Sequence, residues 1–120
     1  MPQVVRAFPL RSSRSALESF AADLKGPRST EAERFYRHFG VISVSWHLQE
    51  TPNGPWVIAV TELYNPTEVA LRFADAGDEF LVWFKAQVLA LTGIDQNTMP
   101  FGPPTTEIFS WSSASRQPDA

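Results

Sequence analysis

The chain has 120 residues, of which 43% are hydrophobic and 19% charged, with a formal net charge of −3 and no cysteine. This balance indicates one globular domain with a real core, argues against a nucleic-acid partner, and excludes disulfides, thiolate chemistry and zinc–thiolate sites. The first ten residues do not fit a signal peptide and no uncharged apolar run approaches the roughly 18–20 residues of a membrane span, so a cytoplasmic protein with no membrane partner is expected.

The N-terminal part of the chain predicts a strand followed by a helix. Residues 3–8 are rich in β-branched and aromatic side chains, and Pro9 ends this run. Ser12 or Ser13 can cap a helix in the segment that follows. Its apolar stripe consists of Leu17, Phe20, Ala21 and Leu24. The Gly-Pro pair at 26–27 interrupts this helix.

A second helix is predicted to begin at Thr30, because Thr30 and Glu33 have the spacing of a capping box. Its apolar side carries Ala32, Phe35, Tyr36 and Phe39. Gly40 follows at the position where a left-handed residue commonly ends a helix.

Residues 41–49 and 56–63 predict a β-hairpin. Along the first run the side chains alternate, with Ile42, Val44, Trp46 and Leu48 on one face and Ser43, Ser45, His47 and Gln49 on the other. The second run is apolar on both faces except for Thr61 and Glu62, which is typical of a strand with little water on either side. The sequence Thr-Pro-Asn-Gly at 51–54 has the chemistry of a tight turn between them.

The stretch from 66 to 92 predicts helical structure with a break near Gly77. Asn65 can cap the first helix, and Pro66 suits its first position. Residues 80–91 are apolar almost all round, so this second helix is expected to pack on the sheet with one side and on another surface with the other. Gly93 marks its end.

Residues 105–111 predict a last strand, and the polar tail 112–120 is expected to be disordered. The resulting order is β-α-β-β-α-β, the ferredoxin-like pattern of an α+β protein, with helices on one face of an antiparallel sheet. Residues 1–111 would form this single domain. The other sheet face is too apolar to meet water, so two such sheets are expected to pair across a two-fold axis into a homodimer.

Two short motifs carry a resemblance: SWHLQ at 45–49 and WFKAQ at 83–87. With their surroundings, over roughly residues 3 to 111, they resemble an uncharacterised bacterial family of the dimeric α/β-barrel superfamily. That family is similar in fold to antibiotic-biosynthesis monooxygenases and stress-responsive barrel proteins. The resemblance implies a ferredoxin-like half-barrel and a homodimer but no assigned reaction. This chain departs from the family pattern at Pro55, where an Asp is common, and at Tyr64-Asn65, where an acidic pair is common.

His47 is the first candidate for catalysis. On the polar face of the hairpin it is expected beside Ser45 and Gln49, with Ala59 and Thr61 opposite. Small side chains around a histidine leave a volume with polar lining, as a small-molecule site requires. An imidazole there can act as acid or base toward a bound phenol or carbonyl. The alternative is a structural histidine that forms a hydrogen bond across the dimer.

Glu62 is the second catalytic candidate, because a carboxylate that interrupts a buried strand can serve as a base in a pocket. The alternative is an ion pair with an arginine such as Arg72. The residues predicted to bind a ligand are Ser45, Gln49, Thr61, Trp46, Trp83 and Tyr36. The aromatic members of this set are equally compatible with the core.

Two classes of function fit these observations. One is an enzyme, a cofactor-independent protein of the monooxygenase or isomerase type, in which His47 serves as acid or base. The other is a non-catalytic binding or stress-associated barrel protein. The leading reading takes a small apolar or aromatic molecule, whereas in the non-catalytic alternative the pocket is small or filled. The chain has no glycine-rich phosphate loop or nucleophile elbow, and its two histidines lack a carboxylate pattern, so no cofactor and no metal are expected.

Overall fold

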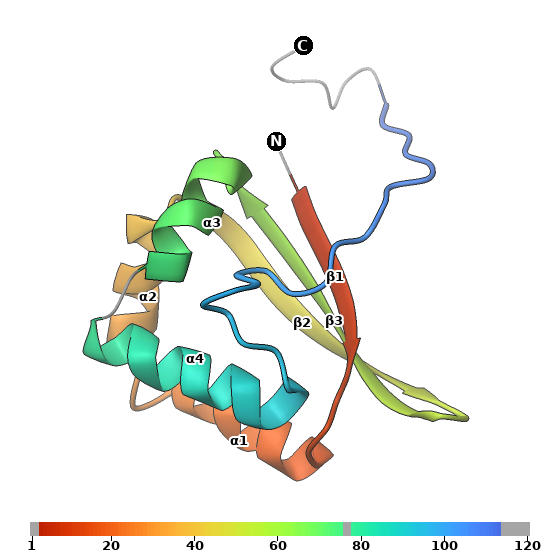
Figure 1. Ribbon diagram of the computed structural model, residues 1–120, viewed down its shortest axis with the longest axis horizontal. Coiled ribbons are helices and arrows are strands. Elements are labelled where there is room, and N and C mark those ends of the chain that lie inside the picture. Colours follow the sequence, from red (N-terminus) through yellow and green to blue (C-terminus); the bar gives the residue numbers. More distant parts are fainter. Residues whose placement is uncertain (1–2, 76–77, 114–120) are drawn as a thin grey trace.

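The structure is a computed structural model that describes residues 3–75 and 78–113. Its elements in chain order are β1 (Gln3–Pro9), α1 (Arg14–Lys25), α2 (Ser29–His38), β2 (Val41–Thr51), β3 (Gly54–Leu63), α3 (Pro66–Asp75) and α4 (Glu79–Thr92). The strands form one antiparallel sheet in the order β1-β3-β2, and the helices lie on one side of it (Figure 1). The predicted α+β class is confirmed.

The predicted hairpin consists of β2 and β3, joined by a two-residue loop at 52–53. Thr51 pairs with Gly54, and the φ of Gly54 is +112°, a conformation that glycine adopts without strain. The Thr51 hydroxyl donates to the Gly54 carbonyl at 2.6 Å and accepts from the Asn53 amide at 3.1 Å. The turn residues therefore close the hairpin as the sequence predicts.

The central strand β3 divides its side chains between two faces of the sheet. Val57 and Leu63 are fully buried beneath the helices, whereas Trp56 is 36% exposed on the opposite face. β1 follows the same alternation, with Val4 and Phe8 in the core. One face of the sheet is thus covered by helices, and the other is open.

The alternation expected along β2 fails at its start. The pairing with β3 shifts between Val41 and Ser43, which is the signature of a β-bulge, and leaves Ile42 47% exposed. Ile42 was expected on the face of Val44 and Trp46. That prediction is wrong because the extra residue at the bulge breaks the two-residue period.

The helix ends show the capping that the sequence predicts at most positions. The Ser13 hydroxyl accepts from the Ala16 amide at 3.0 Å at the start of α1. Asn65 accepts from the Glu68 amide at 3.2 Å before α3. Gly93, with φ of +77°, ends α4. The break expected near Gly77 lies outside the described residues.

The capping box predicted at Thr30 is absent. α2 begins one residue earlier, at Ser29, and Arg28 precedes it without a side-chain cap. The amide of Ser29 donates to the Gly26 carbonyl at 3.0 Å, so a tight turn leads from α1 directly into α2. Thr30 therefore lies inside the first helical turn, where it cannot act as the cap.

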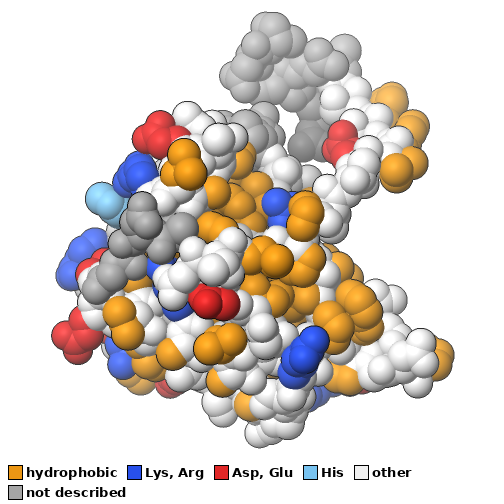
Figure 2. Space-filling view, in the orientation of Figure 1, with side chains coloured by type: hydrophobic (Ala, Val, Ile, Leu, Met, Phe, Trp, Pro, Cys, Tyr) orange, Lys and Arg blue, Asp and Glu red, His pale blue; other side chains and the backbone are white. Residues whose placement is uncertain are grey.

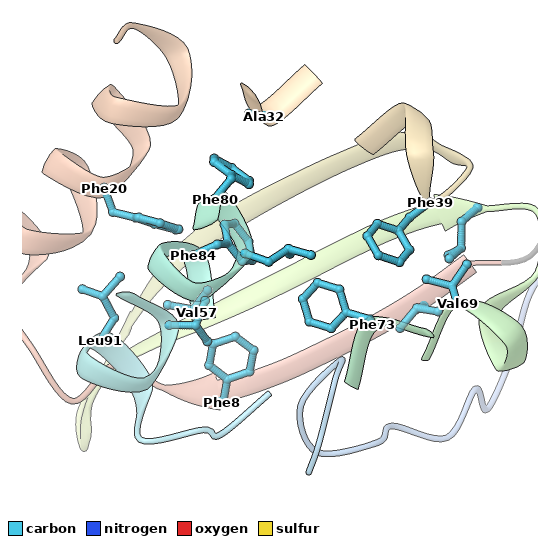
Figure 3. Packing of buried hydrophobic residues seen from close by; sticks show 14 of the residues in the cluster. Phe8, Phe20, Ala32, Phe39, Val57, Val69, Phe73, Phe80, Phe84 and Leu91 are labelled. Atoms are coloured by element: carbon cyan, nitrogen blue, oxygen red, sulfur yellow. The ribbon is translucent and has the colours of Figure 1, made fainter. Parts of the chain in front are cut away.

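Aromatic side chains dominate the core between the helices and the sheet. Figure 3 shows Phe39, Phe73 and Val69 together at one end of this layer. The Phe39 and Phe73 ring centroids are 5.7 Å apart. From α4, Phe84 reaches into the same layer, where its ring centroid lies 5.4 Å from that of Phe35.

Within the described residues, no helix has the length and apolar character needed to cross a membrane.

The strand predicted at 105–111 does not form. The Thr105 hydroxyl donates to the Val5 carbonyl at 2.5 Å on β1, and the chain then leads away from the body of the molecule (Figure 1). Pro103 and Pro104 lack amide hydrogens and so donate no backbone hydrogen bond where the chain reaches β1, and residues 105–111 form no ladder with it. The sheet therefore has three strands, and the last strand of the expected order is wrong. The disordered tail expected at 112–120 falls largely outside the described residues.

Candidate functional site

A cavity of about 90 Å³ lies between the covered face of the sheet and the layer formed by α2, α3, α4 and the loop at 94–102. Its wall is mainly aromatic and includes Phe35, Trp46, Phe73 and Phe84. In the space-filling view, hydrophobic side chains gather between the helices and the sheet (Figure 2). Such a cavity suits an apolar molecule or group.

Three polar side chains also line the cavity: Tyr36 from α2, Thr61 from β3 and Gln96 from the loop after α4. Burial raises the pKa of Tyr36 above its usual value near 10, so its phenol is protonated at neutral pH. Neither the Tyr36 nor the Thr61 hydroxyl forms a hydrogen bond with another residue in 3–75 or 78–113. No acidic or basic side chain contributes to this wall among the residues described.

Gln96 is the most buried of the three, with 9% of its surface exposed. Its Nε2 donates to the Pro100 carbonyl at 2.9 Å, which holds the side chain against its own loop. Its Oε1 is buried and accepts no hydrogen bond from any part of the chain that the structure describes. Sequence reasoning missed Gln96, because it lies in a run of turn-forming residues with no periodic pattern to mark it as buried.

Three of the predicted site residues meet at this cavity. Tyr36, Trp46 and Thr61 come from different elements and all contribute to its wall. The Trp46 ring is also anchored in the core, at 6.0 Å from the Phe8 centroid and 5.8 Å from the Phe20 centroid. These contacts orient the indole toward the helices.

His47 lies on the other face of the sheet, exposed and away from the cavity. It pairs directly with Ile58, so the expected neighbours Ala59 and Thr61 are wrong. Thr51 and Gly54 close the hairpin, and counting back from that pair places His47 opposite Ile58 rather than Ala59. A register error of one residue moves a side chain to the opposite face.

The remaining polar candidates lie on the same open face as His47. The Ser45 hydroxyl and His47 Nε2 are 2.9 Å apart. Glu62 accepts from the Ser43 hydroxyl at 2.8 Å, and Gln49 pairs with Trp56. This face therefore carries a row of polar side chains along β2.

The ion pair considered between Glu62 and Arg72 does not form. Arg72 instead contacts Glu68 at 3.5 Å and the His38 ring nitrogen at 3.2 Å. Trp83, a predicted ligand-binding residue, does not line the cavity. Its ring lies 4.1 Å from the Arg28 guanidinium in a cation–π contact. The Arg72–His38 contact joins α3 to α2, and the Trp83–Arg28 contact joins α4 to the start of α2. Neither pair lines the cavity.

Arg6 is half-buried but carries a buried nitrogen, Nε, that sequence reasoning missed. By register with Ala59 it lies on the covered side of the sheet, between Val4 and Phe8. Its Nη1 donates to the Val5 carbonyl at 3.0 Å, whereas its Nε is buried with no partner in the described chain. Desolvation lowers the pKa of Arg6 below its ordinary value, but Arg6 does not line the cavity.

No group of three or more His, Asp or Glu side chains is placed to hold a metal ion in the part of the chain that the structure describes. Comparison of the chain with protein-family models, with curated proteins and with solved structures gives no match. The aromatic cavity with its three polar groups is thus one arrangement that can bind a molecule, and the larger groove that Tyr36, Ser45 and Trp46 line is another. The predicted acid–base residues lie across the sheet from the cavity.

Proposed function

We propose that this chain binds a small, largely apolar molecule in the cavity between its helices and its sheet. The observation that carries the proposal is the composition of the wall, in which aromatic side chains surround the polar groups of Tyr36, Thr61 and Gln96. A mostly apolar cavity with a few polar groups is the usual form of a small-molecule site.

The cavity as it stands is smaller than a one-ring ligand requires, so such a ligand can enter only if the cavity opens. At about 90 Å³ it is smaller than the roughly 150 Å³ that holds benzene in an apolar protein interior. Tyr36 and Trp46 also line a groove of about 460 Å³ between α1 and β2. Rotation of the Tyr36 side chain toward this groove would enlarge the cavity and provide a route of entry.

Binding without catalysis is the function that this geometry supports best. Tyr36 is the one ionisable side chain that lines the cavity among the described residues, and its raised pKa keeps it protonated at neutral pH. The cavity therefore holds no general base at that pH. Acid–base catalysis by His47, the enzyme alternative, would have to take place on the open face of the sheet, beside Ser45.

We also propose that two copies pair through their open sheet faces, which would complete a barrel of the kind that the sequence resemblance implies. Val5, Trp56, Ile58 and Val60 are the apolar side chains that support this pairing. The C-terminal segment supports it as well, because Ile108 is 88% exposed, Phe109 82% and Trp111 76%. Apolar surface of this extent on a soluble chain commonly marks an interface.

The binding proposal is tested by titrating toluene into the protein and following the melting temperature and the chemical shifts of backbone amides. Toluene should raise the melting temperature in a concentration-dependent way and shift resonances of the cavity wall. Ala59→Leu, which places extra volume in the wall, should abolish the response. Ala7→Leu is the matched control, because Ala7 lies on the neighbouring strand with its side chain on the open face. No response in the wild type, or an equal response in the Ala59→Leu variant, would refute binding in this cavity.

A further inference from the structure

We infer that residues 105–111 of one copy, called here the C-terminal arm, lie in the groove between α1 and β2 of a second copy. Phe109 and Trp111 are the side chains that fill the groove. The inference rests on the pairing of two copies proposed above and names the segment that each copy supplies to the other. It is carried by an exposed apolar arm and an apolar groove that agree in length and in charge.

The groove is large and mainly apolar. Its volume of about 460 Å³ is roughly three times the 150 Å³ that holds benzene in an apolar protein interior. It therefore has room for two aromatic side chains. The apolar residues of its wall come mainly from α1 and β2 and are Leu17, Phe20, Ala21, Leu24, Val44, Trp46 and Leu48.

The groove borders an unpaired strand edge. Among the described residues β2 pairs only with β3, so it is an outer strand of the sheet. Ser45 lines the groove although its hydroxyl contacts His47 on the open face, which shows that the groove reaches the backbone of β2. The backbone of such an edge can bind an extended segment, while the adjoining groove takes alternate side chains.

The arm has the side chains that such a site requires. It forms no helix or strand of its own and leads away from the body of the molecule on the side of β1 (Figure 1). Ile108, Phe109 and Trp111 are all exposed. In an extended segment alternate side chains share a face, so Phe109 and Trp111 project together with Glu107, and Ile108 projects to the opposite side. The two aromatic side chains can therefore enter the groove together.

The arm and the groove also agree in length. From Glu107 to Trp111 an extended chain covers about 13 Å, at roughly 3.3 Å per residue. From Leu17 to Lys25, α1 covers about 12 Å, at roughly 1.5 Å per residue. The part of the arm from Glu107 to Trp111 thus matches the side of the groove that α1 forms.

The charges of the groove set the direction of the arm. Lys25 and Glu18 both line the groove, two turns apart on α1. Glu18 pairs with Arg14 at 3.1 Å, whereas Lys25 is exposed and forms no ion pair with any described residue. Glu107 beside Lys25 would supply the missing counter-charge, and Trp111 would then lie beside Leu17.

A second copy is the source of the arm because each arm begins far from its own groove. β1 and β2 are the two outer strands, about 10 Å apart across β3. The Thr105 hydroxyl holds the start of the arm on β1 through the Val5 carbonyl. To reach its own groove the arm would have to cross the open face, which the proposed pairing covers. A bound arm would also lie over the proposed route of entry beside Tyr36.

The test links two positions that the inference brings together, Lys25 in the groove and Glu107 on the arm. The chain has no cysteine, so Lys25→Cys and Glu107→Cys each introduce one reactive thiol at an exposed position. The two variants carry different isotope labels, are mixed at micromolar concentration and are treated with a short bis-maleimide. Mass spectrometry then identifies linked pairs of unlike chains.

We expect unlike chains to be linked about tenfold faster or more than in a mixture of Glu107→Cys with Leu71→Cys, because docking of the arm raises the local thiol concentration. Leu71 is the matched control, since it is exposed on α3 and lies outside the groove. Both mixtures contain the same arm variant, so only the position of the second thiol differs.

The outcomes separate the inference from the pairing on which it rests. Linkage no faster than in the control, in a protein that sediments as a dimer, would overturn the inference and leave the pairing of sheet faces in place. A double variant, Lys25→Cys with Glu107→Cys, that is linked within one chain would show that the arm fills its own groove, which would also overturn it. A chain that sediments as a monomer would refute the inference together with the pairing.

Discussion

The Lys85 ammonium donates a hydrogen bond of 2.6 Å to the carbonyl of Phe73. Lys85 is 7% exposed in the middle of α4, and Phe73 lies in the last turns of α3. The same ammonium donates to Asn97 Oδ1 at 3.0 Å and lies 4.9 Å from the Phe73 ring centroid. One side chain thus joins α3, α4 and the loop that carries Gln96.

Lys85→Met should therefore lower the free energy of unfolding by about 2–4 kcal/mol, because it leaves the Phe73 carbonyl and the Asn97 side chain without their donor. Urea denaturation followed by circular dichroism measures the change. Lys25→Met is the control, since Lys25 is exposed at the end of α1 and should change stability by about 0.5 kcal/mol or less. Equal effects of the two substitutions would show that the Lys85 contacts do not stabilise the fold.

The two faces of β2 should respond differently to truncation. Trp46→Ala removes a half-buried indole that contacts Phe8 and Phe20, and it should cost about 2–4 kcal/mol. His47→Ala, at the next position, should cost about 1 kcal/mol or less, because its side chain is exposed. Toluene should bind more tightly to the first variant, because loss of the indole enlarges the cavity, and with unchanged affinity to the second. Loss of binding in His47→Ala would contradict the separation of His47 from the cavity.

Tyr36 should make the protein less stable at alkaline pH. Its pKa is raised by burial, so above about pH 10 the unfolded chain loses this proton before the folded chain does. The unfolded state then binds fewer protons, and the free energy of unfolding falls as pH rises through the raised pKa. Tyr36→Phe should remove this part of the slope between about pH 9 and 11, measured by urea denaturation.

Tyr64→Phe is the matched control for the alkaline titration, because Tyr64 is the chain's other tyrosine and is 67% exposed. It should retain the slope of the wild type. A wild-type slope in Tyr36→Phe would show that the buried phenol does not govern the alkaline loss.

Sedimentation should detect the proposed dimer at micromolar concentration. The interface should bury a total area well over about 1,000 Å². Ile58→Glu places a carboxylate in the apolar centre of the open face and should give a monomer. Leu71→Glu changes another exposed hydrophobic residue, 69% exposed on α3, and should leave the dimer intact. A wild type that sediments with the mass of one chain would rule out the pairing.

Local chemistry explains why most of the elements are predictable from sequence. Ser13, Asn65 and Gly93 act at the helix ends through bonds that span only a few residues. The turn at 51–54 likewise closes on itself. Such short-range hydrogen bonds form without help from distant parts of the chain. The strand expected at 105–111 depended instead on a distant partner, β1, and its apolar side chains alone could not specify that pairing.

The candidate site was predictable only in part, because its members are far apart along the chain. Aromatic content and small polar residues pointed to Tyr36, Trp46 and Thr61. Gln96 gave no local signal, since its burial results from the loop returning over β1, where Gly102 lies close to Phe8. His47 was placed with the wrong neighbours because its expected pairing was one residue out of register with the hairpin that Thr51 and Gly54 close.

The sequence by itself determined the helices, the hairpin and its turn, because capping groups, apolar periodicity and glycine conformation act over a few residues. Only the tertiary structure decided which side of the sheet the helices cover, and therefore that Trp46 lines the cavity while His47 faces outward. The physical reason is the two-residue period of a strand. A shift of one position in the pairing of His47 with Ile58 exchanges the two faces, and only packing against the helices makes one of them the inside.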